Sequence, residues 1–457
     1  MSAGPIEFPG FRTVARSAQS AEPRAAEIGH PRLRVALIDQ GVVSCGNFVT
    51  NVLLARWLAV DQYGVFALFL DAILFLNSLQ AALLIYPLTV RCASMDENQV
   101  RRCSGACVLL TLLLAIPLAA ALAVYGFFIG AASVAIWAVL GQTFWQCQET
   151  LRRTLLARRS YSRALVGDSI SYLGQAVILG LLVFGHKADV PRAFIAMAAT
   201  SVAAAVVQGV QIGVQPAGPK AVLRMGQSFW LLGRWVMTAN LTYLITSVCC
   251  SYALARSHGN AAVGRYAALS NLLRIANPLV ITLSTLIVPA VALVSASGTS
   301  PHTLSAAWRV ARHYGLRGAA LLVPYWALLM LFPGHAITLL YRGRSEYLGM
   351  ETDLRIFVCI SAMVLINAVM ASMLNGLRRS RRSMAAQLVG AAACVVVTIP
   401  LTIYFGLEGL LAGTLVSNAA IAGALAILFL DVAHRAHAES AVKEPRQILP
   451  AAKVALV

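Results

Sequence analysis

One stretch of the sequence constrains the fold more than any other. From Cys103 to Gln148 the chain has no Asp, Glu, Lys or Arg. About 20 apolar residues cross the hydrocarbon core of a bilayer, so this run is long enough for two spanning helices, with a reversal between Tyr125 and Gly130. Charge-free runs also occupy 193–219, 275–308 and 409–430. Only 12% of all residues are charged, against about 25% in soluble domains. We therefore predict an all-α polytopic membrane protein.

The runs between charged or Pro/Gly breaks predict twelve transmembrane helices. The predicted spans are 35–55, 64–90, 104–125, 129–148, 164–185, 193–214, 229–254, 266–294, 318–338, 356–377, 384–405 and 409–430.

The basic residues predict the orientation of these spans, because cytoplasmic loops retain Lys and Arg. With the N-terminus inside, 26 of the 36 Lys and Arg residues fall in cytoplasmic segments and 8 in outer loops. The net charge of +18 is thus explained by basic loops rather than by nucleic acid. Residues 1–32 lack the apolar region of a signal peptide, so we expect a disordered cytoplasmic tail there and a second cytoplasmic tail at 432–457.

The two halves of the chain resemble each other at a constant offset of 200 residues. Leu54-Ala55-Arg56 recurs as Leu254-Ala255-Arg256, and Phe66-Ala67 as Tyr266-Ala267. Six helices per half make such a repeat parallel. We predict two six-helix lobes, 33–214 and 229–431, joined by a cytoplasmic linker at 215–228 and facing each other across a central cavity.

Polar residues form a narrow stripe on the first predicted helix. Gln40, Ser44, Asn47 and Asn51 recur at helical spacing, which places them on one face. Such residues either hydrogen-bond between helices or line a cavity. We favour the cavity wall because the seventh helix is polar at three of the four equivalent positions, which include Asn240, Ser247 and Ser251.

Three acidic residues fall within the predicted spans. Asp39 and Asp168 lie close to the cytoplasmic ends of their helices, where we expect them at the membrane interface. Asp71 lies deeper, about 10 Å from the outer end at 1.5 Å per residue. It is a candidate for proton or cation coupling, or alternatively a structural partner for a buried arginine.

Arg274 is predicted well inside the eighth helix, between Asn271 and Asn277. An arginine at membrane depth costs on the order of 3 kcal/mol, so it requires water or an acidic partner. Its planar guanidinium suits phosphate oxygens. We therefore weigh a ligand contact against a structural pair with Asp71. Arg234 corresponds to Arg34 at the 200-residue offset and is interpreted as a basic anchor at the cytoplasmic mouth.

No motif for catalysis or for a cofactor is present. The sequence lacks a Walker motif, H-E-x-x-H and G-x-S-x-G. The nine cysteines contain no C-x-x-C pair, so neither a zinc site nor a disulfide framework is indicated. We expect a protein that is not an enzyme and that has no cofactor or metal.

Three segments resemble a known family. Leu53-Leu54-Ala55-Arg56-Trp57-Leu58 followed by Gln62-Tyr63-Gly64-Val65-Phe66-Ala67-Leu68 resembles the junction of the first two helices of Wzx-type polysaccharide flippases. Arg274 with Asn277-Pro278 and Pro289 is similar to the opening of their second lobe, and the segment from Gly406 to Ala412 is similar to the turn between their last two helices. These flippases belong to the multidrug/oligosaccharidyl-lipid/polysaccharide exporter (MOP) superfamily.

The resemblance implies a transporter that flips an isoprenoid-pyrophosphate-linked oligosaccharide, such as an O-antigen or exopolysaccharide repeat unit, across the bacterial inner membrane by alternating access. It implies that Arg274 and Arg234 face a cationic cavity. It also implies a lipid-linked saccharide as substrate and polysaccharide-assembly proteins as partners. Two alternatives stay open: a multidrug or cation antiporter of the same fold, and a membrane polysaccharide polymerase or ligase.

Overall fold

The computed structural model describes residues 30–92, 95–295, 300–342 and 344–443. Within these ranges the chain is helical and contains no strand. The helices of the first part are α2 (His30–Trp57), α3 (Val60–Gln80), η1 (Ala81–Ile85), α4 (Tyr86–Cys92), α5 (Glu97–Phe128), α6 (Ala132–Ala157), α7 (Tyr161–Asp168), η2 (Ser169–Leu173), α8 (Gly174–Phe184) and α9 (Val190–Ile212).

The second part continues the same pattern of helices with short connections. It consists of α10 (Pro219–Tyr243), η3 (Leu244–Cys249), α11 (Cys250–His258), α12 (Asn260–Arg274), α13 (Asn277–Val294), α14 (Pro301–Leu331), α15 (Pro333–Tyr341), η4 (Ser345–Tyr347), α16 (Glu351–Gly376), α17 (Ser380–Ala393), η5 (Cys394–Thr398) and α18 (Ile399–Lys443). The conformation of Gly406 (φ 62°, ψ −131°) is not helical, so it interrupts α18.

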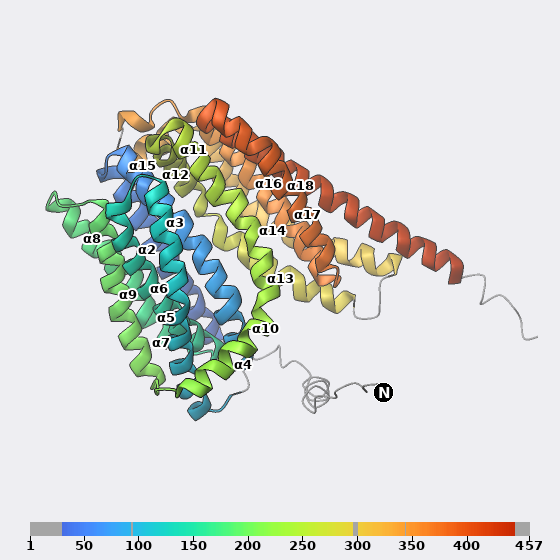
Figure 1. The fold of residues 1–457 in the computed structure, drawn as a ribbon. Helices are drawn as coiled ribbons and strands as arrows, with labels where there is room; N and C mark the ends of the chain where they lie inside the picture. Colours follow the sequence, from blue (N-terminus) through green and yellow to red (C-terminus); the bar gives the residue numbers. More distant parts are fainter. Residues whose placement is uncertain (1–29, 93–94, 296–299, 343, 444–457) are drawn as a thin grey trace, which may run out of the picture.

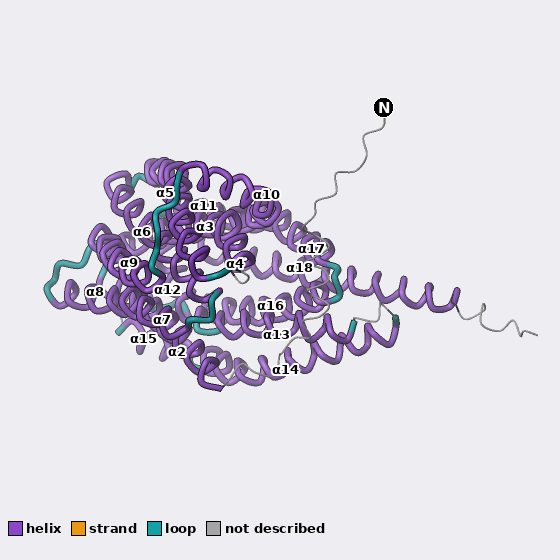
Figure 2. Tube along the Cα trace, turned by 90° about the horizontal axis from the view of Figure 1, so that it is seen from below, coloured by secondary structure: helices purple, strands orange, loops and turns teal. Residues whose placement is uncertain are grey.

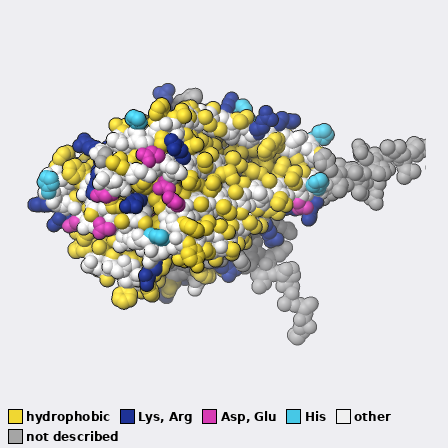
Figure 3. Space-filling view, turned by 90° about the horizontal axis from the view of Figure 1, so that it is seen from above, with side chains coloured by type: hydrophobic (Ala, Val, Ile, Leu, Met, Phe, Trp, Pro, Cys, Tyr) yellow, Lys and Arg dark blue, Asp and Glu magenta, His cyan; other side chains and the backbone are white. Residues whose placement is uncertain are grey.

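The described residues contain nine helical segments that are long and apolar enough to cross a membrane. Their surface supports the same interpretation: Phe184 and Leu339 are each 82% exposed, and hydrophobic side chains cover much of the face in Figure 3. Water would penalise such a surface, whereas lipid tails accept it. The prediction of an all-helical membrane protein is confirmed.

The helices gather into two groups that meet in the middle of the molecule. Helices α2 to α9 lie together on one side, and α13, α14, α16, α17 and α18 lie on the other, in both views (Figures 1 and 2). Helix α12 packs along α3 between the groups, and α10 lies against α3, η1, α4 and α5. The contact between α3 and α12 therefore joins the first half of the sequence to the second.

The structure corrects three predicted helices. The prediction of one unbroken helix over 266–294 is wrong, because a turn at Ile275 and Ala276 separates α12 from α13. Pro278 has no N–H and fits the first turn of the new helix. The helix predicted at 129–148 continues to Ala157 as α6, and the one predicted at 318–338 is divided between α14 and α15.

The predicted linker and tails fall partly on helices. Helix α10 begins at Pro219, inside the predicted linker, and α18 runs to Lys443, inside the predicted C-terminal tail. Most of the predicted N-terminal tail, 1–29, lies outside the described residues, as does 444–457.

Candidate functional site

The polar stripe of α2 runs from an exposed end to a buried one. Gln40 and Asn47 are exposed, Ser44 is half-buried, and Asn51 is buried. The Asn51 side chain donates to the carbonyl of Asn47 at 2.8 Å, and the Gln40 amide donates to the Ser44 hydroxyl at 3.5 Å. The side chains thus share one face of α2, and that face becomes enclosed toward the α2–α3 turn.

Two hydrogen bonds join α3 to the second part of the chain. The Ser251 hydroxyl on α11 donates to Asp71 Oδ2 at 2.7 Å, and the Asn271 amide on α12 donates to the Tyr63 hydroxyl at 2.7 Å. Tyr63, Ser251 and Asn271 are buried. Asp71 and Asn271 are therefore interhelical partners as well as candidate cavity residues.

Arg274 is the last residue of α12 and is partly exposed. It lines a void of about 10 Å³ together with Asn51, Asp71, Tyr266 and Ser270, a volume that matches a single water molecule. In the part of the chain that the structure describes, no ion pair joins Arg274 to Asp71. Arg274 thus combines a place in the lining of this void with partial exposure at the end of α12.

The eight predicted site residues therefore divide into three sets. Asn51, Asp71 and Arg274 share the void, with Asn271 close by on α12. Gln40, Asn47 and Asn277 are exposed on α2 and α13. Arg234 is exposed on α10 and does not line this void. A guanidinium beside amides and hydroxyls can hold an anionic group, and one water-sized void can pass a proton or a water between Asp71 and its surroundings.

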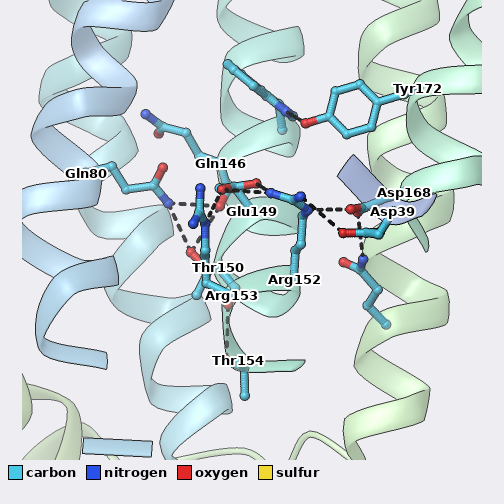
Figure 4. A network of polar contacts seen from close by, with 12 residues as sticks. Asp39, Gln80, Gln146, Glu149, Thr150, Arg152, Arg153, Thr154, Asp168 and Tyr172 are labelled. Atoms are coloured by element: carbon cyan, nitrogen blue, oxygen red, sulfur yellow. Dashed lines mark hydrogen bonds and ion pairs between the residues drawn. The ribbon is translucent and has the colours of Figure 1, made fainter. Parts of the chain in front are cut away.

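A second polar centre, which the sequence analysis missed, lies inside the first group of helices (Figure 4). Arg152 on α6 is 6% exposed. Its guanidinium hydrogen-bonds Asp168 and lies 3.3 Å from a carboxylate oxygen of Glu149 and 3.6 Å from one of Asp39. Arg153 holds the other oxygen of Glu149 at 2.5 Å. Three buried carboxylates thus face two arginines.

Neutral side chains extend this ion-pair cluster to neighbouring helices. Gln80 donates to the Thr150 hydroxyl at 3.0 Å, Gln208 on α9 donates to Asp168 at 3.4 Å, and Ser171 donates to Gln148 at 2.8 Å. The cluster therefore ties α2, α3, α6, α7, η2 and α9 together, as buried charges require partners on all sides.

Arg152 was expected in a basic loop, and this is wrong, because it lies within α6, which continues to Ala157. The position of Asp39 and Asp168 at the membrane interface stays a prediction, and the structure shows both acids buried beside Arg152. Asp39 is 3% exposed and Asp168 is fully buried. The sequence did contain a signal for this. Glu149, Arg152 and Arg153 stand at i, i+3 and i+4, the spacing at which opposite charges pair on a helix. That spacing indicates a helix that continues rather than a loop.

The described residues contain no cluster of His, Cys, Asp and Glu suited to a metal ion. All nine cysteines lie in the described ranges and none is in a disulfide, and six of them are buried in helices.

Comparison with known proteins places this fold. No family model and no curated protein matches the sequence. Among solved structures, the lipid II flippase MurJ in an inward closed conformation has a TM-score of 0.67 at 11% identity, over 91% of this chain and 93% of that one. An inward-facing multidrug resistance MATE family transporter of the MOP superfamily has a TM-score of 0.66 at 13% identity, over 88% and 98%. A multidrug resistance MATE family transporter in an outward-facing conformation has a TM-score of 0.57 at 12% identity, over 89% of this chain and 95% of that one. The chain thus has the fold of MOP superfamily transporters over nearly its whole helical length.

Proposed function

We propose that this protein is a flippase that carries an isoprenoid-pyrophosphate-linked oligosaccharide, such as an O-antigen or exopolysaccharide repeat unit, from the cytoplasmic to the outer leaflet. The observation that carries the proposal is Arg274. It lies at a helix break, it lines a small void together with Asn51 and Asp71, and it is partly exposed, while Asp71 accepts a hydrogen bond from Ser251. A fixed guanidinium in that position suits the pyrophosphate of such a substrate.

The same proposal includes twelve spans in two six-helix lobes. The first lobe, 33–214, contains α2, α3 to α4, α5, α6, α7 to α8, and α9. The second, 229–431, contains α10 to α11, α12 to α13, α14, α16, α17 to Phe405, and α18 from Leu407. Helix α6 carries charges in its second half, yet Glu149 and Arg152 neutralise each other inside the bundle, which permits a buried position at membrane depth. Both termini would be cytoplasmic, in the bacterial inner membrane.

The saccharide head group would pass between the lobes while the isoprenoid chain stays in the bilayer. The exposed part of the α2 stripe, Gln40 and Asn47, supports a polar path that begins on the cytoplasmic side, and Arg274 with Asn277 continues it. Arg234 on α10 is proposed as the cationic anchor at the mouth of this path.

A multidrug or cation antiporter is the second candidate, because MATE transporters score nearly as high as the lipid II flippase in the structural comparison. Asp71 favours this candidate, since an acid near the substrate path attracts cations. Arg274, which shares the same void, opposes it, because a guanidinium repels a cationic substrate.

Complementation separates the two candidates. The gene is expressed in a bacterial strain that lacks a flippase for lipid-linked oligosaccharides and in a second strain that lacks its multidrug exporters. Restored surface polysaccharide in the first strain supports the flippase. Restored resistance to cationic drugs in the second, without polysaccharide in the first, would support the antiporter and refute the proposal.

A further inference from the structure

Two glycines allow α3 and α12 to touch through their backbones. A Cβ on Gly64 would overlap the carbonyl oxygen of Asn260, and a Cβ on Gly264 would overlap that of Val60. The two contacts are related by the 200-residue offset, since 60 corresponds to 260 and 64 to 264. Each helix therefore presents the same glycine and the same carbonyl position to the other, as in a contact between two equal partners.

Two arginines close to these glycines form hydrogen bonds between the two halves. Arg56, at the end of α2, donates to the carbonyls of Leu340 and, at 3.0 Å, Leu339 on α15. In the opposite direction, Arg344 donates to the carbonyl of Arg56 at 2.9 Å and to that of Leu58 at 2.6 Å. Each half thus contributes one guanidinium that donates hydrogen bonds to backbone carbonyls of the other half.

The region around these contacts is tightly closed. Ala55 is fully buried, Leu58 and Tyr347 are each 1% exposed, and the Tyr347 hydroxyl donates to the carbonyl of Ala55 at 3.0 Å. The acceptors of the cross-half bonds made by Arg56, Arg344 and Tyr347 are all backbone carbonyls. Separation would leave these carbonyls and the three donors facing water, which satisfies both, so the contact can break and re-form.

We propose that the two arginines, with Gly64 and Gly264, form a reversible gate that closes the molecule at the α2–α3 turn. With the arginines engaged the gate is shut, as in this structure. When the lobes move apart the arginines release and Ala55 becomes exposed. The inference rests on the proposed function only in requiring that the two lobes move, and it does not depend on which substrate is carried.

The gate is tested with a thiol at its centre. Ala55→Cys is made in a full-length chain whose nine cysteines are replaced by alanine, and a membrane-impermeant maleimide is applied to intact cells and to inverted membrane vesicles. Arg344→Ala and Arg56→Ala should each raise the labelling rate by about tenfold, the factor expected from losing one or two hydrogen bonds of ordinary strength. With the proposed orientation, labelling occurs in intact cells.

Arg355→Ala is the matched control. Arg355 also donates to a backbone carbonyl, that of Met330 at 3.2 Å, but both residues belong to the second half. It should leave the labelling rate unchanged. Equal rates in Arg344→Ala and Arg355→Ala would overturn the gate. Labelling that rises only in vesicles would reverse the proposed orientation and keep the gate.

The glycines provide an independent test of the gate. Gly64→Ala prevents the backbone contact, so the cysteine at position 55 should be labelled fast even with both arginines present. Gly41→Ala is the control, because a Cβ there meets nothing within 4 Å, and it should leave the labelling rate unchanged. A slow rate in a folded Gly64→Ala protein would contradict the proposal. Should complementation fail while labelling follows these expectations, the substrate assignment is refuted and the gate stands.

Discussion

The Ser251 hydroxyl donates a 2.7 Å hydrogen bond to Asp71, and the two residues come from opposite halves of the sequence. The acid predicted as a possible partner for Arg274 therefore has a partner already. Asp71 thus joins α3 to α11 through Ser251 while it lines the same void as Arg274 at the end of α12.

Arg274→Ala should abolish transport, because the pyrophosphate loses its bidentate donor. Arg274→Lys keeps the charge without the planar fork, so it should retain only part of the activity. Surface polysaccharide in the complemented strain measures both, with protein level in the membrane fraction as the control. If Arg274→Ala combined with Asp71→Ala regains transport, Arg274 only neutralises Asp71 and the ligand role is wrong.

Ser251→Ala should weaken the contact between the halves. Asp71 then loses its hydroxyl donor in a half-buried position, at a cost of about 1 kcal/mol. Thermal unfolding of the purified protein in detergent should show a lower Tm. Ser257→Ala is the matched control, because Ser257 on the same helix bonds only the carbonyl of Ala253. Equal Tm values for the two variants would show that the Ser251 bond contributes little.

Arg152→Ala should be the most destabilising single substitution in the ion-pair cluster. It leaves Asp39, Glu149 and Asp168 buried without their common cation, and breaking a buried pair in this way costs about 3–5 kcal/mol. Arg153→Ala, whose side chain is 44% exposed, should cost at most about 1 kcal/mol. Thermal unfolding in detergent measures both. A similar loss of thermal stability in the two variants would mean that the burial of Arg152 does not determine how much its ion pairs stabilise the fold.

The topology has a direct test at the loop between α16 and α17. This loop and the start of α17 carry Arg378, Arg379, Arg381 and Arg382. A single cysteine at Arg381 should react with an impermeant thiol reagent in inverted vesicles and not in intact cells, because basic loops stay on the cytoplasmic side. A cysteine at Asp189, between α8 and α9, should react in intact cells. The reverse pattern would invert the proposed orientation.

The fold class was predictable, and the reason is the bilayer itself. Runs such as Cys103–Gln148 have no stable place in water, and only helices bury every backbone group within one segment. The boundaries were harder, because the prediction treated each charge as the end of a span. That assumption fails in α6, where Glu149 and Arg152 neutralise each other inside the bundle. Nothing near Arg152 in the sequence shows that Asp39 lies beside it.

The candidate site was predicted in part. Of the predicted residues, the structure brings Asn51, Asp71 and Arg274 together at one void, whereas Gln40 and Asn47 of the same stripe are exposed on α2. The turn at Ile275 and Ala276 was not predicted, although Pro278 follows it. A proline is compatible with either a kink or a new first turn, and only packing against α3 decides between them.

The contact between α3 and α12 also has a consequence for how this chain can change over time. At the gate described above, the acceptors that bind Arg56, Arg344 and Tyr347 are main-chain carbonyls, which every residue supplies, so these hydrogen bonds do not specify the side chains at the acceptor positions. Gly64 and Gly264, by contrast, are restricted by the close backbone approach, and positions 56 and 344 by the donors that they supply. A closing surface with so few requirements allows the rest of the sequence to drift while the architecture persists, in keeping with shared folds at 11–13% identity.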